Sequence, residues 1–315
     1  CKQDKIYNNM RIIYNINKKY NSLSFLIQYL KEEKFVKVID CRLRPPIGAY
    51  AKDSLFELIS NGVMQNCATQ HNCALPESGK KRSMEKLIQE MDESAVECGY
   101  FAVRNTEICG NEVIFELNAA YPERFKAFAG LKPHDGWEYN LAQIQRFVLD
   151  GPAVGIAMEP AIYGTPWYVD DEIAFPIYEF CQKNQIPIMM TYGGRNPADA
   201  TYYLPAPMEH VAQAFPDLRL LLLHGGWPWV VPTCSLALNY RNIYLCADMY
   251  MVNAPGQRDY VDAANYFLSD KLMFGSAYPI LSIVDALQHY LHCGIQEKVL
   301  PNILYQNAVS ALQFL

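Results

Sequence analysis

The side chains best suited to chemistry in this sequence are charged groups that follow short apolar segments. In the segment KVIDCRLRPP, Arg42 and Arg44 stand two positions apart. Residues two apart on an extended strand point to the same face, so the two guanidinium groups are predicted to lie side by side. Together they can present planar donors to a carboxylate or to an oxyanion that forms during a reaction. His224 ends a second apolar segment, LRLLLLH, and an imidazole is suited to proton transfer near neutral pH.

The elements that must position these side chains are eight short apolar segments with helical patterns between them. They cover residues 35–41, 100–104, 125–131, 153–158, 186–191, 218–224, 242–247 and 271–275. Strands that are apolar throughout favour a parallel sheet covered on both faces. Eight such units in succession predict the α/β class and a (β/α)8 TIM barrel. A doubly wound open sheet is the alternative, but no Gly-x-Gly-x-x-Gly turn follows the first strand.

In a barrel of this kind, the chemistry takes place at the carboxyl ends of the strands and in the loops that follow. We therefore predict that His224, Arg42 and Arg44 are catalytic. We further predict that a small carboxylated molecule is bound by other strand-end and loop residues, namely Glu159, Tyr163, Thr191, Tyr192, Arg195, Trp227, Asp248 and Tyr278. A cavity lined by aromatic rings and a few charged groups is typical of a small-molecule site.

The composition excludes several classes of partner. The chain has 315 residues, of which 51% are hydrophobic and 19% are charged, as in ordinary globular proteins. Its net charge is −6 and no block of basic residues stands out, so a nucleic-acid partner is not expected. No apolar run approaches the ~20 residues that a membrane span needs, so no membrane partner is expected either.

The chain is predicted to hold one main domain. Residues 1–34 form an N-terminal extension without a signal-peptide core, and residues 35–315 form a single barrel domain. An insertion at about 45–82 follows the first strand and could cap the mouth of the barrel. The ten cysteines are irregularly spaced, which favours reduced thiols and a cytoplasmic protein. A homodimer is common for such barrels and is the oligomer that we expect.

Several segments, taken together, resemble a known family of amidohydrolase-related barrels. That family includes aminocarboxymuconate-semialdehyde decarboxylase, resorcylate-type decarboxylases and pyrone-dicarboxylate lactonase. The matching segments are VIDCRLRP, MDESAV, YPERFKAFAGLKP, IPIMMTYGG, LLLHGGWPWV, MFGSAYP and ILYQNAVSAL, in that order. The resemblance implies a TIM barrel and a hydrolase or decarboxylase that acts on a small cyclic or aromatic substrate.

The resemblance also shows where this chain departs from the family. In metal-dependent members, two His after strand one, a His after strand five and an Asp after strand eight hold a divalent ion. The matching positions here are Arg42, Arg44, Thr191 and Ala277, and of the family's metal-site residues only His224 is kept. An arginine has no lone pair to donate, and one imidazole does not replace the ~four ligands that zinc usually has. The resemblance therefore implies a metal-independent enzyme without a cofactor.

Structural roles remain an alternative for the same residues. Asp40 and Glu159 could each pair with one of the two arginines, since a buried charge needs a partner. Asp248 could cap a helix, and the aromatic residues could simply pack.

Two functions therefore stay open. The first is a metal-independent enzyme that hydrolyses a lactone or a similar acyl bond, or that decarboxylates its substrate. The second is a catalytically inactive barrel that acts as a binding or scaffold protein. Side chains collapsed into mutual pairs in the space between Arg42, Arg44 and His224 would favour the second function, and a carboxylate bound there would favour the first.

The substitutions at the family's ligand positions predict that the purified protein carries no stoichiometric metal at the centre of the barrel. Elemental analysis of protein purified without chelator checks this. One tightly held zinc or manganese per chain, with His224 as a ligand, would contradict the prediction.

Overall fold

The computed structural model describes residues 37–313, apart from residues 53, 105–108, 163 and 196–198. The predicted extension over residues 1–34, the beginning of the first predicted strand and Tyr163 lie outside the described residues. None of the helices in the described part of the chain is long and apolar enough to cross a membrane. The cytoplasmic location and the homodimer stay predictions.

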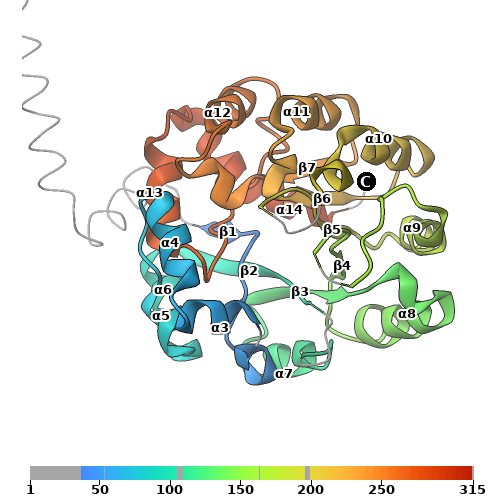
Figure 1. The fold of residues 1–315 in the computed structure, drawn as a ribbon, viewed down its shortest axis with the longest axis horizontal. Coiled ribbons are helices and arrows are strands. Elements are labelled where there is room, and N and C mark those ends of the chain that lie inside the picture. The colour runs from blue at the N-terminus through green and yellow to red at the C-terminus, as the bar shows by residue number, and fades with distance from the viewer. Residues whose placement is uncertain (1–36, 53, 105–108, 163, 196–198, 314–315) are drawn as a thin grey trace, which may run out of the picture.

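Seven parallel strands pair in chain order and form one sheet. They are β1 (Val38–Asp40), β2 (Val96–Ala102), β3 (Phe125–Gly130), β4 (Gly155–Met158), β5 (Ile188–Thr191), β6 (Leu220–Leu223) and β7 (Ile243–Cys246). Figure 1 shows these strands around the centre of the molecule, with helices outside them. The first seven predicted segments each contain or overlap one of these strands, and the predicted TIM-barrel architecture is confirmed.

The eighth predicted strand, residues 271–275, is not a regular strand in the structure. Its backbone still contacts both neighbouring strands. Leu272 forms a parallel bridge with Leu245 on β7, and the Cys41 N–H, just after β1, donates to the Phe274 carbonyl at 2.9 Å. The Phe274 N–H donates away from the sheet, to a carbonyl of the C-terminal helical region. The segment thus closes the ring between β7 and β1, but its ladder is interrupted.

The helices lie around the sheet in chain order. They are α3 (Ser54–Ser60), α4 (Val63–Gln70), α5 (Glu77–Lys81), α6 (Met84–Glu93), α7 (Val113–Ala120), α8 (Trp137–Ile144), α9 (Phe175–Lys183), α10 (Pro205–Ala214), α11 (Val230–Asn239), α12 (Gln257–Asn265), α13 (Ile283–His292) and α14 (Asn307–Leu312). The Ser83 side chain accepts a hydrogen bond from the Lys86 N–H and so caps α6. The segment 45–82, predicted as an insertion, contains α3, α4 and α5.

Both faces of the sheet are buried because side chains alternate along each strand. On β6, Leu221 and Leu223 belong to the cluster inside the barrel, whereas Leu220 and Leu222 belong to the larger cluster between the sheet and the helices. The interior cluster also contains alanines of α14. That helix follows Tyr305, whose ring lies near the amino end of β1. The amino ends of the strands are therefore covered, which leaves the carboxyl ends for a site.

A buried amide attaches α14 to the barrel. Asn307 is 3% exposed, and its Nδ2 donates to the carbonyls of Ser269 at 3.0 Å and Leu272 at 2.7 Å. The Asn307→Ala variant leaves both buried carbonyls without this donor, so the free energy of unfolding should fall by about 1–3 kcal/mol. Urea denaturation checks this. Asn118→Ala, at an exposed position of α7, serves as the control and should change the stability little. Equal stabilities of the two variants would contradict the assigned role.

Candidate functional site

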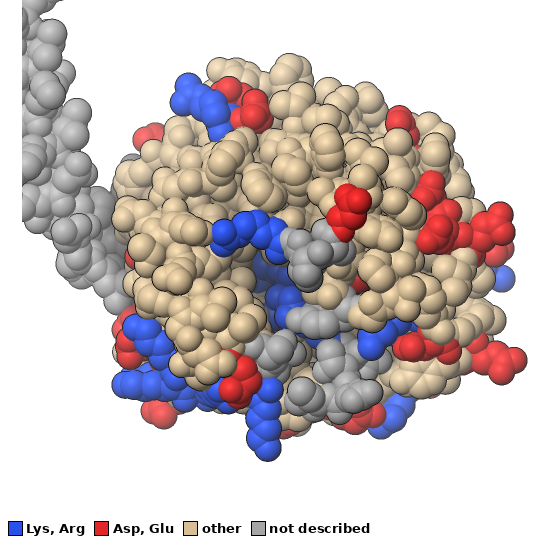
Figure 2. Space-filling model, viewed as in Figure 1, with Lys and Arg blue, Asp and Glu red and all other residues tan. Residues whose placement is uncertain are grey.

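A cavity of about 480 Å³, called here the main cavity, lies where the carboxyl ends of several strands meet. Its charged lining consists of Arg42, Arg44, Arg104 and Arg195, together with the imidazole of His224. Apolar side chains of α3 and α4 form much of the remaining wall. Figure 2 shows Lys and Arg atoms inside a hollow at the centre of this face. Among the described residues no carboxylate lines the main cavity, so its electrostatic potential favours an anion.

Arg42 and Arg44 stand beyond the end of β1 and not on it. The strand ends at Asp40, whose carboxylate accepts hydrogen bonds from the Arg42 N–H at 3.0 Å and the Ser276 N–H at 2.9 Å. The Ser276 hydroxyl also donates to it. The expected pairing of Asp40 with a guanidinium is therefore wrong, because backbone and hydroxyl donors occupy this carboxylate. Both arginines still line the main cavity, and they are only 3% and 4% exposed.

Glu159, at the end of β4, is the counter-ion of the arginines. Its carboxylate accepts from Arg44 Nη2 at 2.9 Å, from Arg104 Nε at 3.1 Å and from the Thr191 hydroxyl at 3.0 Å. Burial alone would raise the pKa of Glu159, but the guanidiniums of Arg104, Arg44 and Arg42 lower it to about 2. Glu159 therefore stays ionised and holds the arginines in place. Thr191 orients this carboxylate.

His224 forms a pair with Asp248 at the ends of neighbouring strands. The imidazole Nδ1 lies 2.9 Å from Oδ1 and 2.8 Å from Oδ2 of Asp248. Burial lowers the pKa of His224, and the nearby Arg42 and Arg44 lower it further, while Asp248 opposes the change. The ring is thus neutral near pH 7, with its proton on Nδ1 toward Asp248. Its Nε2 carries the lone pair and faces the main cavity and Arg42.

Arg42 connects the two groups of charges. Its Nη2 lies 3.4 Å from His224 Nε2, and its Nη1 is buried without a hydrogen-bond partner. The Nε of Arg44 is also buried without one. Burial and the charge of Arg44 lower the pKa of Arg42 to about 10, which still leaves it protonated near neutral pH. Buried donors without partners are costly, so both guanidiniums have donors to offer an incoming anion.

The turns after β6 and β7 have unusual backbone conformations. His224 and Asp248 have φ angles of 63° and 40°, in the left-handed region that costs a non-glycine residue about 1–2 kcal/mol. The Asp248 carboxylate accepts from the His224 N–H at 3.0 Å and from the Met249 N–H at 2.6 Å. The same carboxylate therefore orients the imidazole and holds both turns. Backbone strain that surrounding contacts maintain is typical of functional sites.

Two of the predicted substrate-binding residues lie elsewhere. The Tyr192 hydroxyl donates to the Leu204 carbonyl, and the Tyr278 hydroxyl lies 2.9 Å from Ser78 Oγ. Both tyrosines are at most 1% exposed and belong to the core between the sheet and the helices. The structure thus corrects the prediction for these two residues, because their rings pack into the core and do not line the main cavity.

The remaining loop residues support the main cavity in different ways. The ring of Trp227 stacks on Tyr250 at 4.8 Å, and Tyr250 in turn lines the cavity. Arg195, in the loop after β5, donates to Gln70 Oε1 at 2.7 Å and to Cys67 Sγ at 2.9 Å, both on α4. It therefore ties the strand-end loop to the helix above the cavity.

Sequence reasoning assigned no role to Arg104, and it placed the insertion that contains α3 and α4 over the barrel mouth without naming site residues in it. The position of Arg104 at the end of an apolar segment was a signal for its role. The position of the insertion after strand one was a signal for α3 and α4, but their individual apolar side chains read equally well as core.

Comparison with known proteins identifies the family. The family model described as Amidohydrolase matches residues 40–314. The chain belongs to the amidohydrolase family. A TIM-barrel protein from Bordetella bronchiseptica, described as uncharacterized, is 32% identical to this amidohydrolase-family chain. That match has a TM-score of 0.81 and covers 88% of this chain and 98% of that one. No curated protein matches the chain.

More distant members share the fold. The 2,6-dihydroxybenzoate decarboxylase from Rhizobium is 17% identical with a TM-score of 0.65, and the match covers 88% of this chain and 98% of that one. A dihydroxybenzoic acid decarboxylase from a Polaromonas species, solved with bound manganese, is 15% identical with a TM-score of 0.61. That match covers 88% of this chain and 96% of the other. At this level of identity the likeness concerns the fold.

The donor groups in this chain do not fit a divalent cation. The carboxylate of Glu159 is already bonded to Arg44 and Arg104. The positively charged guanidinium of Arg42 faces the Nε2 lone pair of His224. Within the described residues, no three His, Cys, Asp or Glu side chains come together in a way that could hold a metal ion. Buried guanidiniums would repel a dication, so we assign no step to one.

The Glu159→Gln variant tests whether this carboxylate holds the arginines together. It leaves buried guanidiniums without their counter-ion, so the free energy of unfolding at pH 7 should fall by about 3 kcal/mol. Urea denaturation measures this. Glu57→Gln, which breaks an exposed ion pair with Arg82, is the control and should cost less than ~1 kcal/mol. A Glu159→Gln variant as stable as the wild type would contradict the proposed role.

The pH dependence follows from the same ion cluster. The pKa of Glu159 is about 2 in the folded protein, below its ordinary value of 4.5. Its stabilising contribution is therefore complete above about pH 4.5 and is lost as the pH falls toward 2. This shift corresponds to a contribution on the order of 3 kcal/mol. Between about pH 4.5 and pH 2, the free energy of unfolding of Glu159→Gln should therefore fall less than that of the wild type.

Proposed function

We propose that this protein is an enzyme that hydrolyses a lactone or a similar acyl bond in a small carboxylated cyclic or aromatic compound, and that it does so without a metal ion. The observation that carries the proposal is a neutral His224, held by Asp248 at Nδ1, whose Nε2 faces a cavity lined by arginines. Membership of the amidohydrolase family supports a hydrolase-like or decarboxylase-like role.

Charge and unused donors support the binding of a carboxylate. The lining of the main cavity contains arginines and, among the described residues, no carboxylate. The unpartnered Nη1 of Arg42 and Nε of Arg44 offer hydrogen-bond donors to a substrate carboxylate or to an acyl oxygen. The apolar side chains of α3 and α4 would contact the ring.

The proposed chemistry follows from the positions of His224 and Arg42. The His224 Nε2 removes a proton from a water molecule, whose oxygen adds to the acyl carbon. The oxyanion that forms accepts hydrogen bonds from Arg42, which stays protonated because its pKa is about 10. When the acyl bond breaks, the leaving oxygen takes the proton from His224. Asp248 stabilises the imidazolium between these two proton transfers.

Decarboxylation is the second candidate, and the fold that the chain shares with dihydroxybenzoate decarboxylases favours it. In that reaction carbon dioxide leaves, its bonding electrons stay on the ring carbon, and this carbon takes a proton from protonated His224. The lowered pKa of His224 disfavours that acid near neutral pH. The two reactions are therefore distinguished by pH: hydrolysis should slow as the pH falls through the His224 pKa, whereas decarboxylation should speed up.

A catalytically inactive scaffold fits the arrangement less well. In a scaffold, each buried arginine would be expected to pair with a carboxylate. Arg44 does so with Glu159, but the guanidinium of Arg42 faces the imidazole of His224, and a cavity of about 480 Å³ remains beside it. An open cavity with unused donors supports ligand binding over a purely structural role.

Anion binding and proton transfer should be separable by mutation. We expect a screen of lactones and carboxylated aromatic compounds to yield a substrate whose turnover is unaffected by chelators. Arg42→Lys keeps the charge but loses the planar fork, so kcat/KM should fall on the order of 10²-fold. His224→Asn should abolish most of kcat while the substrate still binds. Steady-state kinetics and binding titrations measure both effects.

The exposed Arg258→Lys and His292→Asn serve as matched controls and should behave as the wild type. Wild-type turnover in His224→Asn would refute the acid–base role. Unchanged anion affinity in Arg42→Lys and Arg44→Lys would make the arginines structural and favour the scaffold.

A further inference from the structure

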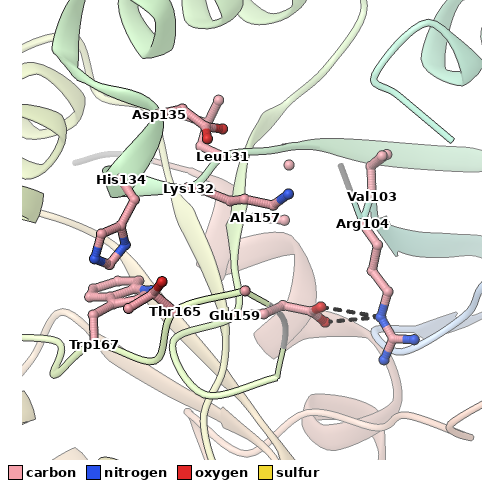
Figure 3. Close-up of a pocket in the computed structure, with 12 residues that line it drawn as sticks. Val103, Arg104, Leu131, Lys132, His134, Asp135, Ala157, Glu159, Thr165 and Trp167 are labelled. Carbon is pink, nitrogen blue, oxygen red and sulfur yellow. Dashed lines mark hydrogen bonds and ion pairs between the residues drawn. The ribbon is translucent and has the colours of Figure 1, made fainter. Parts of the chain in front are cut away.

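A second cavity adjoins the main cavity and plays no part in the proposed chemistry. It has a volume of about 270 Å³ and is called here the side cavity. Arg104 lines both cavities, and Glu159 lines the side cavity while it bonds to Arg44 in the main one. Figure 3 shows the Arg104–Glu159 pair on one side of the side cavity, with Lys132 reaching in from the end of β3 and Trp167 opposite.

Local sequence directs Lys132 into the side cavity. Pro133 follows it and keeps it extended, with φ −127° and ψ 123°. The alternation of β3 therefore continues past its end, and Lys132 lies on the same side as Phe128, whose ring belongs to the cluster inside the barrel. The buried Asn140 donates to the Lys132 carbonyl at 2.8 Å and fixes this backbone. The position of the lysine is thus built into the fold.

The ammonium group of Lys132 lacks a counter-ion among the described residues. No carboxylate in that part of the chain lies within ion-pair distance of its Nζ. Glu159 is already bonded to two guanidiniums and a hydroxyl, and Asp135, which also lines the cavity, is exposed at its rim. The side cavity therefore has charge left to offer an acidic group.

We propose that the side cavity is a second anion subsite, in which Lys132 binds a carboxylate group and Trp167 forms the apolar wall. The carboxylate belongs either to a second acidic group of the molecule bound in the main cavity or to a separate small carboxylic acid. The first source rests on the proposed function, because it places the first carboxylate at Arg42 and Arg44. The second source does not.

Isothermal titration of the full chain with three probes tests the subsite. If one molecule spans both cavities, isophthalate binds the wild type about tenfold more tightly than benzoate, and Lys132→Met removes this difference without changing the affinity for benzoate. If the carboxylate is separate, acetate binds protein already saturated with benzoate, and Lys132→Met weakens acetate binding about tenfold. Lys132→Arg keeps the charge and should preserve either behaviour.

The control is Lys298→Met, which removes an exposed ammonium remote from both cavities and should change no affinity. Methionine keeps the apolar stem of Lys132, and thermal unfolding of the variant confirms that it is folded. If Lys132→Met alters binding of neither isophthalate nor acetate, the subsite does not exist. If instead benzoate does not bind, or binds equally to Arg42→Lys, the proposed function fails. Acetate titrated into the ligand-free wild type and Lys132→Met then still decides the role of Lys132.

Discussion

The arrangement at the carboxyl end of this barrel depends on one buried carboxylate. Three guanidinium groups lie together with little access to water, and their mutual repulsion would separate them without a counter-ion. Glu159 supplies that counter-ion, bonding directly to Arg44 and Arg104. The guanidiniums still line the main cavity, where no carboxylate of the described residues joins them. Glu159 therefore stabilises the folded site and still leaves it attractive to an anion.

The second pair, His224 and Asp248, has a different task from the arginine cluster. Asp248 fixes the tautomer of the imidazole and, through the same oxygens, holds the left-handed turns after β6 and β7. Arg42 is the point of contact between the two groups, 3.4 Å from the imidazole. An anion that accepts hydrogen bonds from Arg42 would weaken this contact and leave the His224 lone pair available. Binding and base strength would then be coupled through one guanidinium.

Family membership and site chemistry point in different directions here. The chain has the amidohydrolase barrel over residues 40–314, yet arginines occupy the strand-one positions at which its metal-dependent relatives are expected to carry histidines. The strand ends that hold metal-binding side chains in one protein can hold guanidinium side chains in another. The barrel determines where a side chain points and not which chemical group it has. Arginines in place of metal ligands support the proposal of an anion site.

The sequence by itself determined the architecture and the main chemical groups. Apolar segments such as LRLLLLH form strands because both faces of a parallel sheet are buried, and strand ends such as Arg42 and His224 converge because all strands run the same way. Local signals were sufficient for these features. The interruption of the eighth strand could not be predicted from the sequence. Its residues have the pattern of a strand, and only contacts with distant parts of the chain interrupt the ladder.

Which groups pair was decided only by the tertiary structure. Asp40 and Glu159 both read as partners for the arginines. Asp40 instead accepts from the local Arg42 N–H and from the amide and hydroxyl of Ser276, which only closure of the barrel brings to it. Tyr192 reads as a pocket residue, yet its ring packs into the core. Hydrogen-bond partners far apart in the chain depend on register and crossing geometry, and neither the type of a residue nor its spacing contains that information.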